Sequence, residues 1–281
     1  GQHIAPLLRR RKVAVITGSG RGIGREMALK LASEGARLVL NDLDDEPAAA
    51  VQEEIRRLGG EAVVCCGNVA SADFAERLID TAIEAFNGLD IVINNAGYTW
   101  DNVIQKTTDE QWYAMIDVHL TAPFRILRAA QPVIRALSQA EAQAGRRVVR
   151  KVVNVSSVAG VFGNAGQVNY STAKAGIMGL TMTLAKEWGR MSTTVNCVAY
   201  GLIKTRGTDA TSDGNTFINI EGRAIKVGVN PDLMAMLERS IPLGRAGTPE
   251  EAAGAAYLFC IPESDYVSGQ IVLCTGGLTG I

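Results

Sequence analysis

The sequence has few residues that commonly bind metal ions. Its two histidines, His3 and His119, are far apart, and none of its five cysteines, at positions 65, 66, 197, 260 and 274, forms a CxxC pair. Zinc sites need several such ligands at short, regular spacing. We therefore expect no metal site, and we expect the cysteines to be reduced thiols.

The chain also lacks an excess of charge and any long apolar run. Its 28 Lys plus Arg and 29 Asp plus Glu leave a formal net charge of −1, which argues against nucleic acid or a membrane surface as the partner. No apolar run is long enough for a transmembrane helix. A basic cluster at 9–12 precedes no apolar signal core. We expect residues 1–11 to form a flexible leader and the protein to be cytoplasmic.

Short apolar runs alternate with segments of helical spacing along the rest of the chain. The runs are rich in Val and Ile and have no consistent polar face, as in strands buried on both sides of a parallel sheet. Expected strands are 13–17, 37–41, 62–66, 91–94, 151–156, 194–199 and 270–274, and expected helices are 22–34, 46–58, 71–86, 109–137, 169–189 and 249–258. This alternation predicts an α/β fold, a doubly wound parallel sheet of about seven strands with helices on both faces.

No break in composition divides the chain, so we expect one domain over residues 12–281. A polar stretch at 138–150 is expected to extend a helix and loop before the fifth strand. A longer stretch, about 200–248, mixes glycines and polar residues with apolar ones. Long inserts of this kind are often functional, and we interpret it as a substrate lid.

The first expected strand leads directly into a glycine-rich turn. The turn reads TGSGRGIG over residues 17–24, with glycines spaced as GxxxGxG, and an amphipathic helix follows. Free backbone N–H groups and the helix dipole favour a pyrophosphate at such a junction. The candidate cofactor-binding residues here are Gly18, Ser19, Arg21, Gly22, Ile23 and Gly24.

An aspartate at the end of the second expected strand bears on the choice of cofactor. Asp42 lies 18 residues beyond Gly24, where an acidic residue can accept hydrogen bonds from the adenosine ribose. A carboxylate there would repel a 2′-phosphate, which favours NAD(H). NADP(H) stays an alternative, because Arg21 could reach that phosphate. Asp42 could also be a solvated carboxylate or a helix cap in the acidic run 42–46.

A serine, a tyrosine and a lysine stand at a spacing that suits proton transfer. Ser157 ends the fifth expected strand, and Tyr170 and Lys174 follow on a helical segment. Residues i and i+4 share one helix face, so the ammonium can lie beside the phenol and lower its pKa. Tyr170 could then act as a general acid, with Ser157 donating to a substrate oxygen.

These motifs together resemble the short-chain dehydrogenase/reductase family. The matching segments are TGSGRGIG at 17–24, NNAG at 94–97, VNVSSVAG at 153–160, YSTAK at 170–174 and the closing YVSGQIVLCTGG. Within the family, GNAGQVNYSTAKAG at 163–176 is most similar to 3-oxoacyl-(acyl-carrier-protein) reductases. The resemblance implies that Ser157 orients the substrate, Tyr170 donates the proton and Lys174 binds the ribose. It also implies cofactor contacts from Asn68, Val69, Asn95, Ala96, Gly97, Ile203 and Thr205.

Three positions depart from the family pattern. His119 stands where an asparagine usually anchors a water relay to the lysine, and it either replaces that anchor, with a pKa near 6.5 that could add a pH dependence, or packs without a role. Tyr200 replaces a proline after the sixth strand. Asn68 replaces an acidic residue that meets the adenine, and its amide oxygen could make the same contact.

The leading hypothesis is an NAD(P)-dependent enzyme that interconverts a ketone and a secondary alcohol by hydride transfer. Its expected substrate is a 3-oxoacyl thioester, linked to acyl carrier protein or coenzyme A, or another hydrophobic carbonyl compound. The alternatives are a steroid or sugar-alcohol dehydrogenase and a catalytically idle nucleotide-binding regulator. The resemblance further implies a homo-oligomer, a tetramer, with a helical interface between 109–137 and 169–189.

Overall fold

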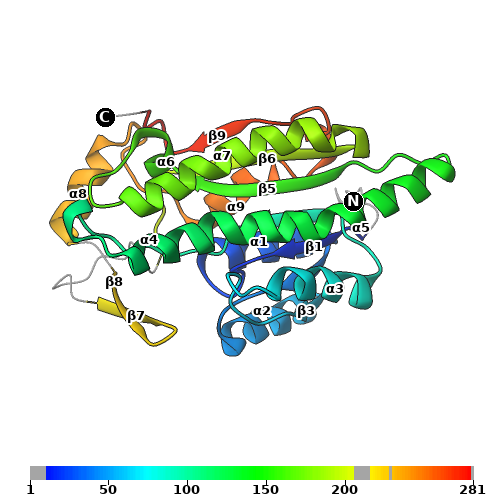
Figure 1. Cartoon of the computed structure of the whole chain (residues 1–281), viewed down its shortest axis with the longest axis horizontal. Helices are drawn as coiled ribbons and strands as arrows, with labels where there is room; N and C mark the ends of the chain where they lie inside the picture. Colours follow the sequence, from blue (N-terminus) through cyan, green and yellow to red (C-terminus); the bar gives the residue numbers. More distant parts are fainter. Residues whose placement is uncertain (1–10, 206–215, 228–229, 280–281) are drawn as a thin grey trace, which may run out of the picture.

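Seven parallel strands form the central sheet of the molecule (Figure 1). The computed structural model describes residues 11–205, 216–227 and 230–279, so the expected leader lies outside them except for Arg11. The strand order is β3-β2-β1-β4-β5-β6-β9. The strands are β1 (Val13–Ile16), β2 (Arg37–Leu40), β3 (Glu61–Val64), β4 (Ile91–Asn94), β5 (Arg150–Ser157), β6 (Thr193–Tyr200) and β9 (Ile271–Cys274). The chain reverses its winding direction between β1 and β4, so the predicted doubly wound sheet is confirmed.

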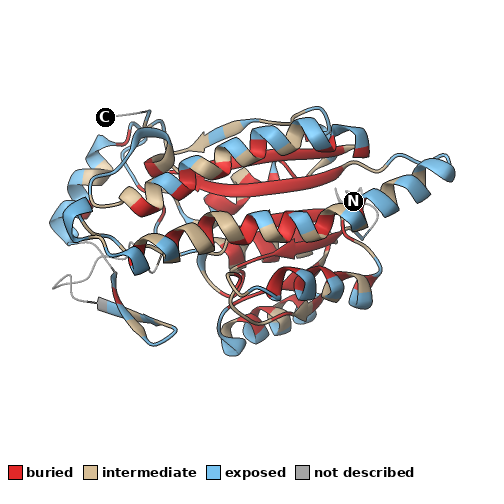
Figure 2. Ribbon diagram, in the orientation of Figure 1, coloured by how far each residue is buried: buried red, intermediate tan, exposed pale blue. Residues whose placement is uncertain are grey.

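Helices cover both faces of this sheet. One apolar cluster joins the sheet to α1 (Gly22–Ser33), α2 (Asp45–Arg57) and α9 (Pro249–Tyr257). A second cluster joins the other face to α3 (Phe74–Phe86), α5 (Ala122–Gln143) and the end of α7 (Val168–Trp188). The buried residues are concentrated in the strands between these layers (Figure 2). Apolar side chains on both sides of each strand explain why the strands lack a polar face in the sequence.

The segment expected as one helix over 109–137 is divided. Thr108 caps α4 (Asp109–Ile116) with a capping box in which Gln111 is the partner. The next five residues, Asp117–Thr121, form a π-helical turn before α5 continues to Gln143. The predicted extension into the polar stretch is therefore confirmed, and the π turn is a feature that helical spacing did not predict.

The expected lid contains regular structure of its own. The strands β7 (Thr216–Ile220) and β8 (Arg223–Val227) form an antiparallel hairpin, and α8 (Pro231–Ser240) follows. Residues 206–215 and 228–229 of the lid lie outside the described part of the chain. Shorter elements elsewhere are α6 (Val158–Phe162) and the 3₁₀ turns Ile104–Lys106, Gly189–Met191 and Pro262–Ser264.

Candidate active site

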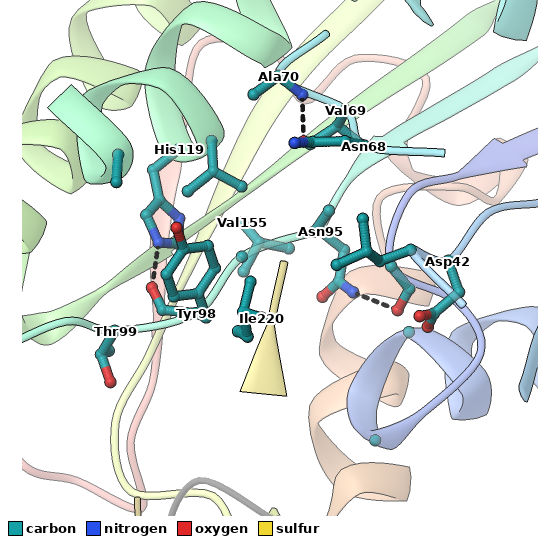
Figure 3. Close-up of a pocket in the computed structure, with 18 of the residues that line it drawn as sticks. Asp42, Asn68, Val69, Ala70, Asn95, Tyr98, Thr99, His119, Val155 and Ile220 are labelled. Carbon is teal, nitrogen blue, oxygen red and sulfur yellow. Dashed lines mark hydrogen bonds between the residues drawn. The ribbon is translucent and has the colours of Figure 1, made fainter. Parts of the chain in front are cut away.

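A cavity of about 1000 Å³ lies at the carboxyl edge of the sheet. It is lined by residues that follow β1 to β6 and by the β7–β8 hairpin. In Figure 3, Ile220 of the hairpin lies between the group around His119 and the side chain of Asp42. The predicted site residues on its wall are Gly18, Arg21, Gly22, Ile23, Gly24, Asp42, Asn68, Val69, Asn95, Ala96, Gly97, His119, Ser157, Tyr170, Lys174, Ile203 and Thr205.

The glycine turn provides one end of this cavity. Gly18 and Gly22 have φ angles of +63° and +56°, which glycine adopts without strain. A side chain at Gly18 would lie 2.8 Å from the Cα of Ala96, so the turn packs directly on the chain after β4. No side chain caps the start of α1, so its first N–H groups have no capping side chain as a partner. The residues of this first turn line the cavity, where such N–H groups suit a pyrophosphate.

Ser19 does not line this cavity, although it belongs to the same motif. Its side chain is fully buried, and its hydroxyl donates to the carbonyl oxygen of Ile16 at 2.9 Å. The hydroxyl oxygen of Ser19 also accepts a hydrogen bond from the backbone N–H of Asn41 at 3.0 Å. Ser19 therefore fastens the glycine turn to the end of β2, and the structure gives its side chain a supporting position.

Asp42 and Arg21 face each other beside the glycine turn. A nitrogen of Arg21 lies 3.5 Å from a carboxylate oxygen of Asp42, and the other lies 3.0 Å from Asp44. Asp42 is almost buried and lines the cavity. Two carboxylates therefore hold the cation that could otherwise bind a 2′-phosphate.

Asn68 and Val69 follow β3 on the same side of the cavity. The side-chain oxygen of Asn68 accepts from the backbone N–H of Ala70 at 2.9 Å (Figure 3). Its side-chain nitrogen donates to Glu221 of the hairpin at 2.8 Å. The amide oxygen, which was expected to contact the adenine, is bonded to Ala70 in this structure, and the amide nitrogen is bonded to Glu221.

The chain after β4 joins the two ends of the site. The side-chain nitrogen of Asn95 donates to the carbonyl oxygens of Thr17 and Gly18, both at 3.2 Å, and so holds the glycine turn. Ala96 and Gly97 continue along the cavity wall. A side chain on Gly97 would collide with the imidazole of His119, so glycine is required beneath that ring.

Ser157 and Tyr170 meet at the opposite end from the glycine turn. Ser157 ends β5, and its hydroxyl oxygen accepts from the N–H of Ala159 at 3.1 Å. Burial raises the pKa of Tyr170, and a hydrogen bond from Ser157 acts in the opposite direction. The sequence predicted a lowered pKa for this phenol, and the structure gives the reverse because burial is the larger effect.

Lys174 lies one helical turn after Tyr170 and is almost completely buried. Its ammonium donates to the carbonyl oxygen of Val155 at 2.9 Å and lies 5.8 Å from the centre of the Tyr170 ring. Burial lowers the pKa of this lysine to about 8. The lysine is still mostly charged at neutral pH, and the predicted grouping of serine, tyrosine and lysine is present.

His119 reaches the same place from the π-helical turn. Its ring stands edge-on to Tyr170 with the ring centres 5.0 Å apart. Its Nε2 lies 2.6 Å from the carbonyl oxygen of Tyr98 and so carries the proton (Figure 3). Burial, aided by the charge of Lys174, lowers its pKa well below 6.5. The expected titration near neutral pH is therefore not supported.

The other nitrogen of His119 is a buried acceptor. Within the described residues, Nδ1 has no hydrogen-bond partner. A bare imidazole nitrogen accepts a proton donor at low cost, whereas leaving it unpaired in the interior is unfavourable. This atom is therefore an unsatisfied acceptor that is buried beside Gly97.

Tyr200 and the start of the lid form the remaining wall. The hydroxyl of Tyr200, which replaces the family's proline, donates to the carbonyl oxygen of Ala252 in α9 at 2.5 Å. Ile203 is buried, and the flanking backbone pairs with Gly247 through hydrogen bonds of 2.9 Å. Thr205 follows on the cavity wall. The segment is therefore held without a proline ring.

Several lining residues were not predicted from the sequence. They lie on the α4 helix, in the loop after Gly97 and on the hairpin, and they are Tyr98, Thr99, Glu110, Tyr113, Phe217, Ile218, Ile220, Glu221 and Arg223. Among these residues, only the apolar ones of the hairpin had a signal in the sequence, because the insert that contains them mixes apolar residues with polar ones.

Two features, a membrane-spanning helix and a cluster of metal ligands, are absent from the described residues. In the part of the chain that the structure describes, no helix combines the length and apolar character needed to cross a bilayer. Likewise, the described residues contain no group of three His, Cys, Asp or Glu side chains that could hold a metal ion.

Comparisons with known proteins agree with this geometry. The family model for short chain dehydrogenase matches residues 12–216. The 3-oxoacyl-[acyl-carrier-protein] reductase of Synechocystis sp. is 39% identical over 269 residues, covering 95% of this chain and 96% of that protein. The reductases of the same name from Staphylococcus aureus and Vibrio harveyi are 35% and 34% identical, each over 95% of this chain and 98% and 97% of their own lengths.

Proposed function

Because this chain belongs to the short chain dehydrogenase family, we propose that it reduces a 3-oxoacyl thioester to the 3-hydroxyacyl thioester with a nicotinamide cofactor. The observation that carries the proposal is the cavity itself, with an anion-binding glycine turn at one end and Ser157, Tyr170 and Lys174 at the other. The names of the relatives support a 3-oxoacyl substrate carried on acyl carrier protein, and a coenzyme A thioester is the alternative carrier.

The side chains of this site fit a nicotinamide dinucleotide along the cavity. The N–H groups at the start of α1 would bind the pyrophosphate, Asp42 the adenosine ribose and Lys174 the second ribose. The cofactor supplies the hydride. The protein fixes the positions of the two reacting groups, which removes much of the entropic cost of bringing them together.

Proton transfer is the part of the reaction that this chain performs itself. Tyr170 is a protonated phenol at neutral pH, so it can donate to the ketone oxygen as negative charge develops there, although burial raises its pKa and so makes it a weaker acid. The hydroxyl oxygen of Ser157 accepts a hydrogen bond from the N–H of Ala159, and its hydrogen is donated to the ketone oxygen. The charge of Lys174 stabilises the resulting phenolate.

His119 is the group through which the proton is replaced in this proposal. Its neutral ring is fixed by the bond to Tyr98, and Nδ1 is a buried acceptor without a partner among the described residues. A water admitted to this nitrogen by a small movement of the ring would pass a proton toward Lys174, whose charge acts on His119. The imidazole thereby takes the place of the amide usual in the family.

The decisive test is turnover of a 3-oxoacyl thioester with NADH and NADPH, by wild type and by Tyr170→Phe. The variant lacks only the hydroxyl, so it should still bind cofactor while kcat falls by about 10²- to 10⁴-fold. Near-wild-type turnover by Tyr170→Phe would refute the mechanism. Turnover of steroids or sugar alcohols in place of thioesters would refute the substrate while keeping the mechanism.

We propose NAD(H) as the preferred cofactor. Asp42 occupies the ribose end of the cavity, and Arg21 is held between Asp42 and Asp44. The ratio of kcat/KM for NADH over NADPH should exceed one in wild type and fall in Asp42→Ala. A wild-type preference for NADPH would mean that Arg21 leaves the two carboxylates for the 2′-phosphate.

The proposal also covers the cellular compartment and the oligomeric state of the enzyme. We place it in the cytoplasm as a homo-oligomer. Free cysteines, of which Cys65, Cys197 and Cys260 are buried, suit a reducing compartment.

A further inference from the structure

The β7–β8 hairpin touches the far end of the cofactor cavity through its tip. The carboxylate of Glu221 accepts a hydrogen bond of 2.8 Å from the side-chain nitrogen of Asn68, which lies 153 residues earlier in the chain. Both residues line the cavity that also contains Asp42. The tip of the lid therefore lies at the part of the site beyond the proposed ribose position.

The two polar atoms of the Asn68 amide are fixed by their neighbours. The N–H of Ala70 requires an acceptor, so the oxygen of Asn68 must face it at 2.9 Å. The nitrogen then faces Glu221 and the cavity. Asn68 thus offers the cavity a donor, and the nearest acceptor on that wall is the Glu221 carboxylate that it binds.

The turn at the tip of the hairpin holds Glu221 in place. Only two residues, Glu221 and Gly222, join β7 to β8, and their φ angles are +52° and +82°. Such turns favour Asn, Asp or Gly at the first position, because other side chains are strained there. The side chain of Asn219 accepts from the N–H of Gly222 at 2.7 Å and supports the turn. A glutamate in a strained position is better explained by its contact than by the turn.

The first residue of β8, directly after the turn, is fixed by contacts with the chain after β4 and with α4. Arg223 forms an ion pair of 2.9 Å with Glu110 of α4 and lies over the ring of Trp100 at 5.3 Å. Ile225 of β8 is almost completely buried. Contacts of Glu221 and Arg223, on either side of Gly222, therefore hold the tip of the hairpin between Asn68 and α4.

We propose that Glu221 reads the adenine of the cofactor, so that the lid hairpin completes the nucleotide site. The 6-amino group of adenine donates hydrogen bonds and its ring nitrogens accept them. Glu221 accepts from the amino group, and the second N–H of Asn68 is available for a ring nitrogen. The two residues share one hydrogen bond and present an acceptor next to a donor, which is the pattern that this edge of adenine requires.

This assignment has a consequence for the order of events at the site. Because Glu221 belongs to the lid, a bound adenine stabilises the hairpin position across the cavity, and the docked hairpin in turn slows release of the dinucleotide. The same hairpin also lines the cavity through Phe217 and Ile218. Occupation of the adenine position is thereby linked to the position of the hairpin over the cavity. The inference rests on the proposed binding of a nicotinamide dinucleotide.

The test measures equilibrium binding of NADH and of its hypoxanthine analogue, in which a carbonyl oxygen replaces the 6-amino group. Titration calorimetry gives both dissociation constants without turnover. Wild type should bind NADH roughly tenfold or more tightly than the analogue, since a matched pair of hydrogen bonds discriminates between bases at this level. In Glu221→Ala the ratio should approach one. In Glu221→Gln it should also fall, because an amide can donate to the carbonyl oxygen.

A matched control separates this contact from a general effect of charge. Asp232 is exposed in the first turn of α8, outside the cavity, and Asp232→Asn removes the same charge from the same lid. That variant should keep the wild-type ratio, and an equal fall there would overturn the assignment. An unchanged ratio in both Glu221 variants that still bind NADH would also overturn it. Failure of wild type to bind NADH or NADPH would instead refute the proposed function.

Discussion

Burial shifts the pKa of three titratable side chains at the reacting end of the cavity. It lowers the pKa of Lys174 to about 8 and that of His119 well below 6.5, and it raises the pKa of Tyr170. At neutral pH the lysine is charged, the histidine is neutral and the tyrosine holds its proton. This is the combination that a proton donor for ketone reduction needs, and it is present before any ligand binds.

The first prediction concerns Lys174 and pH. A lysine with a pKa lowered to about 8 is charged below that pH and loses its proton as the pH rises through it. If the charged form binds the ribose, the dissociation constant for NADH should rise progressively above about pH 8 and stay nearly level from pH 6.5 to 7.5. Titration of NADH fluorescence across this range measures it.

The control for this prediction is Lys174→Met, which has an unbranched side chain only one atom shorter and removes the charge. It should bind NADH more weakly at pH 7 and show no inflection near pH 8. A wild-type curve that stays level to pH 9.5 would mean that the charge of Lys174 contributes nothing to binding.

The second prediction concerns His119 as a positioning residue. His119→Ala removes the acceptor Nδ1 and leaves the carbonyl of Tyr98 without its donor. We expect kcat to fall by about tenfold or more, the order expected for loss of a positioned proton relay, with KM little changed. His119→Asn should recover most of the loss, because its amide can donate and accept.

Solvent isotope effects distinguish this role from packing. Slower proton transfer in His119→Ala should enlarge the effect of D₂O on kcat, and His119→Asn should return it toward the wild-type value. The wild-type pH–rate profile should show no inflection from His119 between pH 6.5 and 8, since burial lowers its pKa well below 6.5. An equal loss in Ala and Asn variants with an unchanged isotope effect would assign His119 to packing alone.

The elements of the fold differ in how strongly the sequence specifies them. All seven sheet strands and most helices were predicted correctly, because each is a buried run or an amphipathic repeat. The π-helical turn at Asp117–Thr121 was missed, since it keeps helical spacing on both sides and shifts the phase by one residue. The hairpin was missed because Glu221-Gly222 is a poor match to the usual turn residues. Both missed features bring site residues into the cavity.

The third prediction concerns the junction between β6 and α9. Tyr200→Phe removes the hydroxyl that donates to Ala252 and leaves the ring in the core. The free energy of unfolding should fall by about 1 kcal/mol, the usual value of a buried hydrogen bond. Urea denaturation at pH 7 measures the change.

Tyr266→Phe serves as the comparison, because Tyr266 is fully exposed. Its midpoint should match that of wild type. If Tyr200→Phe also matches wild type, the tyrosine does not replace the rigidity of the missing proline.

For the molecule as a whole, the sequence located the site better than it described its chemistry. Every residue predicted to line the site, from motif spacing or from the family resemblance, lies on the cavity wall except Ser19, because strand ends of a parallel sheet meet at one edge. The direction of the Tyr170 pKa was wrong, because it depends on how much protein surrounds the phenol. The contact between Asn68 and Glu221 could not be predicted, since it joins residues 153 positions apart through a lid without a sequence signature.

The last prediction is the oligomeric state. α4, the π-helical turn and α7 pack against one another, and exposed apolar side chains remain on α5 and α7, at Phe124 and Met182. A second copy of the chain could cover this surface across a two-fold axis. We expect sedimentation at micromolar concentration to show an oligomer, a tetramer, and we expect Phe124→Glu to shift it toward smaller species.

The control is Leu58→Glu, which places the same charge at an exposed site at the end of α2 and should leave the assembly intact. A wild-type monomer would refute this interface, and equal dissociation by both variants would show that added charge alone separates the subunits.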